Sequence, residues 1–295
     1  MEKSVQSATI TVDLFWLGGW RIVGVIVETI AVSILALLGI ILGAFLSKTR
    51  RPYCWSGFGV SFLLIGVLAA ARFAPRISFT APLSWIMIGR VRLVVTAVAV
   101  TIGLTTSIIH LRYAVQKCSV GILMVIIVGW FCISPFLAPA FVENDLAALK
   151  SNIDYQGICY QSRDYTCGPA AAVTALTRLG LHAEEGEIAV RAHSNPIIGT
   201  LPGCLSDAIR ELYENEGLSC QYRYFDSLSQ LERYPPVLVV IKDTFFTDHC
   251  VAVMGINDEA VTIADPVGGK RQMNRDTFER VWRCSGIVLE RRSAL

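Results

Sequence analysis

The stretch QSRDYTCGPAAA, residues 161–172, places one cysteine, Cys167, directly before a helical pattern. Pro169 suits the first turn of a helix, the alanines that follow favour helix, and Gly180 is a typical helix end. The sequence therefore predicts a helix over residues 168–179. A thiolate at the N-terminus of a helix is stabilised by the helix dipole, so this position favours a nucleophilic cysteine.

Three more residues complete a pattern for catalysis by a thiol. Gln161 lies six residues before Cys167, and His249 and Asp265 lie sixteen residues apart, far downstream. Residues 250–265 have the sequence pattern of two strands joined by a short turn. A hairpin of this length brings Asp265 beside His249. We expect the histidine to hold the thiolate as an ion pair and the aspartate to select its tautomer. The Gln161 amide and the Cys167 backbone N–H would stabilise an oxyanion.

Nearby residues leave some alternatives open. Asp248 and Asp164 are rival carboxylates for orienting the histidine. Gly168 and the small alanines after it are predicted to let a substrate backbone approach closely.

Residues 161–172, together with Asp248-His249 and Ala264-Asp265-Pro266, resemble the bacteriocin-processing, double-glycine cysteine peptidase family. The resemblance covers about residues 155–291. It implies a papain-like fold, cleavage of leader peptides after a Gly-Gly pair, and frequent fusion to an ABC transporter. It also implies that Cys167 is the nucleophile, His249 the base, Asp265 the orienting acid and Gln161 the oxyanion donor.

Two departures from this family stand out. Thr166 precedes the cysteine, where many transporter-fused members have Asp. No GxxxxGK[ST] sequence is present, so this chain has no ATPase, and a transporter partner would be a separate protein.

The N-terminal half has the composition of a membrane region. Leu, Ile, Val, Ala, Phe and Gly dominate residues 22–142, and a bilayer core needs about 20 apolar residues in a helix. We therefore predict a transmembrane region over residues 1–142 and a peptidase domain over residues 143–295. The predicted spans are residues 22–47, 55–71, 93–109 and 119–142. Residues 73–89 are interpreted as a loop with an interfacial or re-entrant piece.

The basic residues in the loops give conflicting signals about orientation in the cell membrane. Lys48, Arg50, Arg51, Arg112 and Lys117 follow the first and third spans, which by the positive-inside rule places the peptidase domain outside the cytoplasm. A second set in the middle loop favours the reverse: Arg72, Arg76, Arg90 and Arg92. The balance favours an extracytoplasmic domain slightly.

The C-terminal half reads as an α+β domain, with helices first and an antiparallel sheet after them. Besides the helix after Cys167, the expected helices are residues 184–192, 205–216 and 275–282. The expected strands are residues 219–225, 237–242, 250–256, 261–265 and 286–290.

Composition and charge exclude some classes of function. The net charge of +2 and the lack of a basic patch exclude a nucleic-acid partner, and no cofactor or metal site is expected. The nine cysteines form no zinc-ligand spacing; free thiols are the simplest interpretation, and one or two disulfides are the alternative. The main hypothesis is a membrane-anchored cysteine endopeptidase acting on peptides or proteins. The alternatives are a catalytically silent domain that binds peptides for a membrane partner, and a thiol amidase or acyltransferase.

Overall fold

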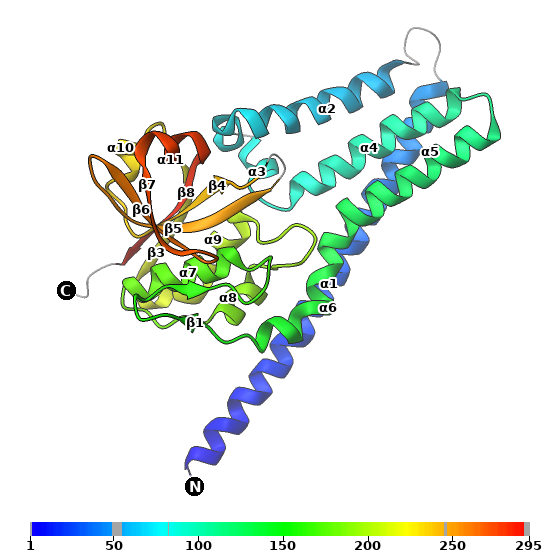
Figure 1. Cartoon of the computed structure of the whole chain (residues 1–295). Coiled ribbons are helices and arrows are strands. Elements are labelled where there is room, and N and C mark those ends of the chain that lie inside the picture. Colours follow the sequence, from blue (N-terminus) through cyan, green and yellow to red (C-terminus); the bar gives the residue numbers. More distant parts are fainter. Residues whose placement is uncertain (1, 49–54, 82, 245–246, 292–295) are drawn as a thin grey trace. The chain divides into compact units, whose positions relative to one another are not determined.

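The computed structural model describes residues 2–48, 55–81, 83–244 and 247–291, with backbone only for residues 2–23. The chain divides into two compact units, and Figure 1 labels their helices and strands. The first unit comprises Met1–Ile65 and Leu93–Phe141, and the second comprises Gly66–Arg92 and Val142–Leu295. The peptidase fold therefore shares its unit with the segment that joins the second and third apolar helices. Arg50 and Arg51, used above for orientation, lie outside the described residues.

Four helices of the described chain are long and apolar enough to cross a membrane, which indicates a membrane protein. These candidate spans overlap the predicted ones and are Gly24–Lys48, Ser56–Phe73, Val91–His110 and Ala114–Ala147. They belong to α1 (Glu2–Lys48), α2 (Ser56–Phe73), α4 (Val91–His110), and α5 (Ala114–Ile126) with α6 (Ser134–Ala147). The fourth is longer than predicted because a π-helical segment, η3 (Ile127–Ile133), joins α5 to α6 without a break.

The first unit packs through small residues. A Cβ on Gly39 would lie 2.1 Å from Oγ1 of Thr101, and a Cβ on Gly43 would lie 2.7 Å from the carbonyl oxygen of Ile102. Glycine at these positions lets α1 approach α4 closely, as is common where helices associate without a hydrophobic driving force. The Thr101 hydroxyl donates to Ala97 O of its own helix at 2.8 Å, so no polar hydrogen is left unpaired there.

The second unit contains an antiparallel sheet of six strands in the order β3-β8-β4-β5-β6-β7. The strands are β3 (Leu218–Tyr224), β4 (Val237–Lys242), β5 (Asp248–Ile256), β6 (Ala260–Asp265), β7 (Gly269–Asn274) and β8 (Trp282–Arg291). Its helices are α3 (Leu83–Met87), α7 (Cys167–Arg178), α8 (Glu185–Arg191), α9 (Pro202–Tyr213), α10 (Leu228–Leu231) and α11 (Arg275–Val281). The unit also contains four short elements: the 3₁₀ turns η2 (Pro75–Phe79) and η4 (Glu214–Glu216), and the paired strands β1 (Asn152–Ile153) and β2 (Cys159–Tyr160).

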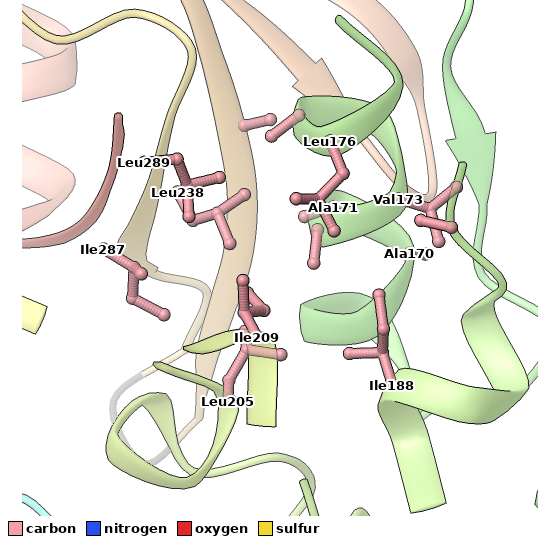
Figure 2. Packing of buried hydrophobic residues seen from close by; sticks show 14 of the residues in the cluster. Ala170, Ala171, Val173, Leu176, Ile188, Leu205, Ile209, Leu238, Ile287 and Leu289 are labelled. Carbon is pink, nitrogen blue, oxygen red and sulfur yellow. The ribbon is translucent and has the colours of Figure 1, made fainter. Parts of the chain in front are cut away.

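Both faces of the sheet are covered by apolar cores. On one face, Leu238 packs with residues of α7 and α9, among them Leu176 and Ile209 (Figure 2). On the other face, Val237 and Val239 pack with Phe278 of α11 and its neighbours. Successive residues of β4 thus enter opposite cores, as the period of two in a strand requires. Figure 1 shows α7 and α8 on the opposite side of this sheet from α10 and α11.

The predicted α+β layout of helices followed by strands is confirmed, and the strand predicted over residues 237–242 coincides with β4. The sequence analysis missed β7, which pairs with β6 at the edge of the sheet. This strand reads GKRQMN and has no alternating apolar face, as is usual for an edge strand facing water. The middle loop contains single helical turns, η2 and α3; an interfacial position for it stays a prediction.

Candidate active site

Cys167 is the first residue of α7 and is partly exposed. The preceding turn is closed by Thr166, whose hydroxyl donates to Arg163 O at 2.9 Å and accepts from Arg163 N at 3.1 Å. Gly168 does not line an open surface, contrary to the expectation above. A Cβ there would lie 3.1 Å from Cδ2 of Leu205, and the alanines after it are buried in the core. The small residues of α7 therefore serve close packing against the sheet and α9.

The hairpin of β5 and β6 brings His249 and Asp265 together as the sequence predicts. Nε2 of His249 lies 2.9 Å from Oδ1 of Asp265. The Cys167 thiol lies near the same imidazole and helps to raise its pKa, and with Nε2 engaged by the carboxylate, the ring nitrogen left to face the sulfur is Nδ1. The imidazole therefore bridges the thiol at the start of α7 and the carboxylate at the end of β6.

The electrostatics of this pair favour the charged forms of both groups. Burial lowers the pKa of His249, but its hydrogen bonds with Asp265 and Cys167 outweigh that effect and raise the pKa to about 9. Burial likewise raises the pKa of Asp265, and hydrogen bonds from His249 and the Val267 backbone outweigh it and lower the pKa to about 2. At neutral pH the site thus contains an imidazolium and a carboxylate.

Asp265 has two further partners that the sequence analysis did not foresee. The backbone N–H of Val267 donates to Oδ1 at 2.8 Å, and Nη1 of Arg271 lies 3.3 Å from Oδ2. Arg271 is on β7, the missed strand, and its guanidinium crosses over Gly268, where a Cβ would lie 1.9 Å from Nη2. These contacts keep the carboxylate oriented toward the histidine.

The backbone of Gln161 is hydrogen-bonded to the segment that contains Asp265. Its N–H donates to the carbonyl oxygen of Pro266, the residue after Asp265, at 3.0 Å. Its side-chain Oε1 is buried and has no hydrogen-bond partner among the described residues. An unsatisfied buried polar atom costs about 1–3 kcal/mol, and such atoms are unusual outside functional sites.

Glu185 supports the site, and the sequence analysis did not single it out. It begins α8, its side chain is fully buried, and its carboxylate accepts from Ser162. The Ser162 N–H donates at 2.9 Å and the Ser162 hydroxyl at 2.6 Å. Glu185 therefore fixes the residue that follows Gln161. The two partners are 23 positions apart, and no local pattern in the sequence predicts their contact.

The rival orienting carboxylates lie elsewhere. Asp248 is paired with Arg72 and Arg283, and Asp164 is exposed on the loop before Cys167. The structure therefore brings Asp265, and neither rival, to the imidazole. The catalytic roles of Gln161 and the other three residues remain predictions.

Burial affects four other cysteines of the C-terminal half. All of the described cysteines are free. Burial raises the pKa of Cys159 to about 12 and that of Cys220 to about 11, and it also raises those of Cys250 and Cys284. Buried thiols of this kind are poor nucleophiles at neutral pH. Among the described residues, no group of three or more His, Cys, Asp or Glu side chains could hold a metal ion.

Comparison with known proteins identifies the family of this domain. A profile of the Peptidase C39 family matches residues 156–294. An uncharacterized protein of Methanothermobacter marburgensis is 31% identical over 143 residues, which are 48% of this chain and 94% of that protein. The chain belongs to the Peptidase C39 family. A relative of its C39 domain in Methanothermobacter thermautotrophicus is 29% identical over 147 residues, 50% of this chain and 97% of that protein.

Solved structures of C39 peptidase domains are also similar to the C39 domain of this chain. The peptidase domain of Streptococcus ComA, a bifunctional ABC transporter involved in quorum sensing, is 20% identical; the match covers 45% of this chain and 96% of that domain, with a TM-score of 0.40. A double glycine motif protease from an AMS/PCAT transporter, solved with its leader peptide, is 15% identical over 49% of this chain and 96% of its own, with a TM-score of 0.39. Family membership confirms the predicted papain-like fold of the C-terminal domain.

Proposed function

We propose that this chain is a membrane-anchored cysteine endopeptidase with Cys167 as its nucleophile. The observation that carries the proposal is the position of His249, which is hydrogen-bonded to Asp265 and lies near enough to Cys167 for the thiol to raise its pKa. Membership of the C39 family supports the same activity. A cysteine kept only for packing would not need a histidine partner that is itself oriented by a buried carboxylate.

The proposed reaction follows from these contacts. The Cys167 thiolate attacks the carbonyl carbon of the substrate, and the resulting oxyanion accepts hydrogen bonds from the Gln161 amide and the Cys167 N–H. The His249 imidazolium then gives its proton to the leaving amine, which departs and leaves a thioester on Cys167. Water attacks the thioester while neutral His249 takes a proton from it, and the carboxylic acid product is released. Asp265 keeps the ring in place throughout.

For the substrate class, we propose peptide segments, with leader peptides cleaved after Gly-Gly as the specific candidate. Family membership and the residue-by-residue match to the double-glycine peptidases support this choice.

For the location, we propose that the C39 domain faces away from the cytoplasm. In a four-span arrangement two crossings separate residues 74–90 from the C39 domain, so both emerge on one side. A position on the same side of the membrane agrees with the finding that this segment and the C39 domain belong to one compact unit. Arg72 and Arg76 of this segment form ion pairs with Asp248 and Asp226, so they are partly neutralised as topological signals. Lys48, Arg112 and Lys117 then favour a cytoplasmic location for the opposite loops. Shielding of the domain from protease in sealed right-side-out vesicles would contradict this.

The activity is tested by digesting a peptide library with the full chain in detergent, as wild type, Cys167→Ala and Cys204→Ala. We expect cleavage by wild type and Cys204→Ala and none by Cys167→Ala. Cleavage that persists in Cys167→Ala would refute the nucleophile. Binding of peptides without cleavage would favour the silent alternative, and release of ammonia or transfer to added amines would favour an amidase or acyltransferase.

A further inference from the structure

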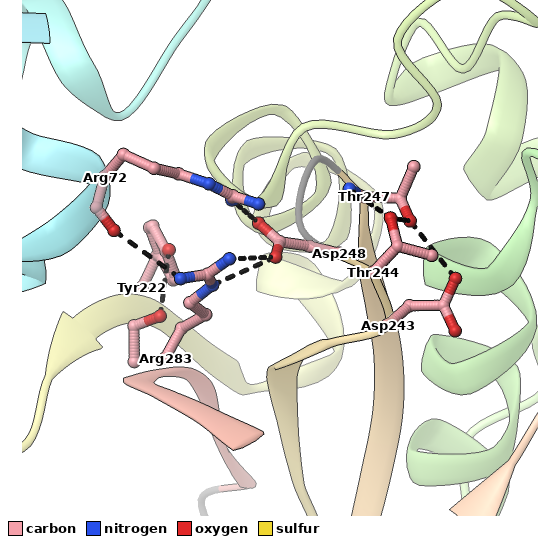
Figure 3. Close-up of polar contacts among 8 residues, drawn as sticks. Arg72, Tyr222, Asp243, Thr244, Thr247, Asp248 and Arg283 are labelled. Atoms are coloured by element: carbon pink, nitrogen blue, oxygen red, sulfur yellow. Dashed lines mark hydrogen bonds and ion pairs between the residues drawn. The ribbon is translucent and has the colours of Figure 1, made fainter. Parts of the chain in front are cut away.

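Asp248, the residue directly before His249, is bound by two arginines (Figure 3). Nε and Nη2 of Arg283, on β8, donate to Oδ1 of Asp248 at 2.9 and 2.8 Å. Nη1 of Arg72 donates to the other carboxylate oxygen, Oδ2. Both oxygens at the first position of β5 are therefore held by charged donors.

Arg72 contacts both Asp248 and Arg283. Its side chain binds Asp248, and its carbonyl oxygen lies 3.5 Å from Nη1 of Arg283 (Figure 3). The Arg283 side chain is 14% exposed, and those of Asp248 and Arg72 are 29% and 32% exposed. Such partly buried pairs with good geometry are stronger than pairs in open solvent. Arg72 is the penultimate residue of α2, which is a candidate membrane span.

The segment after α2 is also anchored to the C39 domain by packing. The ring of Phe79 in η2 lies 5.0 Å from that of Tyr222 and 6.0 Å from that of Tyr224, both on β3. The Tyr222 hydroxyl donates to Oγ of Ser285 on β8 at 3.2 Å. At the other end of the segment, a Cβ on Gly203 would lie 2.4 Å from the carbonyl oxygen of Ile88. Arg72 is therefore presented to Asp248 by a segment with contacts at several points.

The turn before β5 also restrains the start of this strand. Thr247 Oγ1 lies 2.6 Å from Thr244 Oγ1 and donates to Asp243 at 3.2 Å (Figure 3). These are exposed contacts between polar side chains close in sequence, and each contributes little in water. The arginine pair thus adds contacts from α2 and β8 to the pairing of this end of β5 with β4.

We infer that Arg72 is a positioning residue, which acts through Asp248 to hold His249 between Cys167 and Asp265. The inference rests on the proposed peptidase function. Its physical basis is that a catalytic imidazole must be kept within about 0.5 Å of its productive position by the groups around it. His249 is the second residue of its strand, and at this end the strand pairs with β4 alone, since its pairing with β6 begins at Ala252. The end of α2 thereby forms part of the catalytic domain.

The test uses the full chain in detergent micelles, with Arg72→Gln, Arg72→Lys and Asp248→Asn. The matched control is Arg76→Gln, which removes the same charge from the same segment. Arg76 lies 3.8 Å from Asp226, and both side chains are largely exposed. The readouts are kcat and KM for peptide cleavage and the rate of iodoacetamide labelling at Cys167, with thermal unfolding to show that each variant is folded.

We expect Arg72→Gln and Asp248→Asn to lower kcat about tenfold with little change in KM, since small misplacements of a catalytic group are costly. Labelling of Cys167 at pH 7 should slow in parallel, because the imidazolium stabilises the thiolate. Arg72→Lys should restore part of the loss, and Arg76→Gln should match wild type.

Wild-type kcat and labelling in folded Arg72→Gln or Asp248→Asn would overturn the inference, as would an equal loss in Arg76→Gln. Labelling of Cys167 needs no substrate, so it tests the positioning role of Arg72 separately from the proposed peptidase function. If wild type cleaves no peptide but the labelling of Cys167 still slows in Arg72→Gln and Asp248→Asn, the proposed function fails and the positioning role stands.

Discussion

Replacing Asp265 with asparagine should shift the titration of His249 toward acid and narrow the pH range of activity. The pKa of His249 is raised from the ordinary 6.5 to about 9, which corresponds to about 3 kcal/mol in favour of the imidazolium. The side chain is only 17% exposed, so water screens this interaction little. The hydrogen bond with Asp265 is the largest of the contributions that raise this pKa. In Asp265→Asn the burial of the ring, which lowers its pKa, is left opposed chiefly by Cys167.

We therefore expect the alkaline limb of kcat/KM, near pH 9 in wild type, to move to about pH 7 or below in the variant. The assay is a pH series of peptide cleavage and of iodoacetamide labelling at Cys167, with the full chain in detergent. Asp258→Asn is the matched control, because it removes a carboxylate from the exposed turn of the same hairpin. An alkaline limb that stays near pH 9 in Asp265→Asn would refute the assigned pairing.

The same shifts make a prediction about stability against pH. Because the folded pKa of His249 is raised, its contribution is full below pH 6.5 and is lost as the pH rises through about 9. Because the folded pKa of Asp265 is lowered, its contribution is present above about pH 4 and is lost as the pH falls through about 2. The two pKa shifts describe one interaction, so their contributions to stability are not added. Thermal unfolding should thus show a loss between pH 6.5 and 9.5 that is smaller in Asp265→Asn.

Three other substitutions test the surroundings of the site. Gln161→Ala should lower kcat by about 10²–10³, or about 2.7–4 kcal/mol, with KM and Cys167 labelling nearly unchanged; wild-type kcat in the folded variant would show that another group is the oxyanion donor. Glu185→Ala leaves both Ser162 donors without their charged acceptor and should lower the stability of the full chain by about 3 kcal/mol or more. An unchanged unfolding temperature in detergent would contradict that role. Arg271→Gln should change kcat/KM less than about threefold, since this side chain is 55% exposed; a loss as large as that of Asp265→Asn would make Arg271 an essential orienting group.

Much of the peptidase fold is predictable from local pattern. The alanine-rich run after Cys167 encodes α7, and the β-branched run over residues 237–242 encodes β4, because propensity and periodicity act over a few residues. The hairpin of β5 and β6 is equally local, and its length alone predicts that Asp265 returns to His249. The four apolar helices follow from composition, since the length of such a run is set by the thickness of a bilayer.

Other features depend on contacts between residues far apart in the sequence. No periodic pattern in the sequence predicts three of these features. They are the buried pairing of Glu185 with Ser162, the polar edge strand β7 with Arg271, and the ion pairs of Asp248 with Arg72 and Arg283. Asp248 illustrates the difference, because the sequence offers it as a rival to Asp265 for the histidine. The sheet order, with β4 between β8 and β5, brings Arg283 within reach of this carboxylate, and the packing of the segment after α2 brings Arg72 to it.

The sequence by itself determined the membrane region, the α+β layout and the chemical identity of the four candidate site residues, because each depends on residue type and short-range spacing. The tertiary structure alone decided which groups surround those four residues and that the segment between α2 and α4 belongs to the same compact unit as the C39 domain. These outcomes depend on how distant elements pack, and a carboxylate pairs with whichever donors the folded chain brings within about 3 Å.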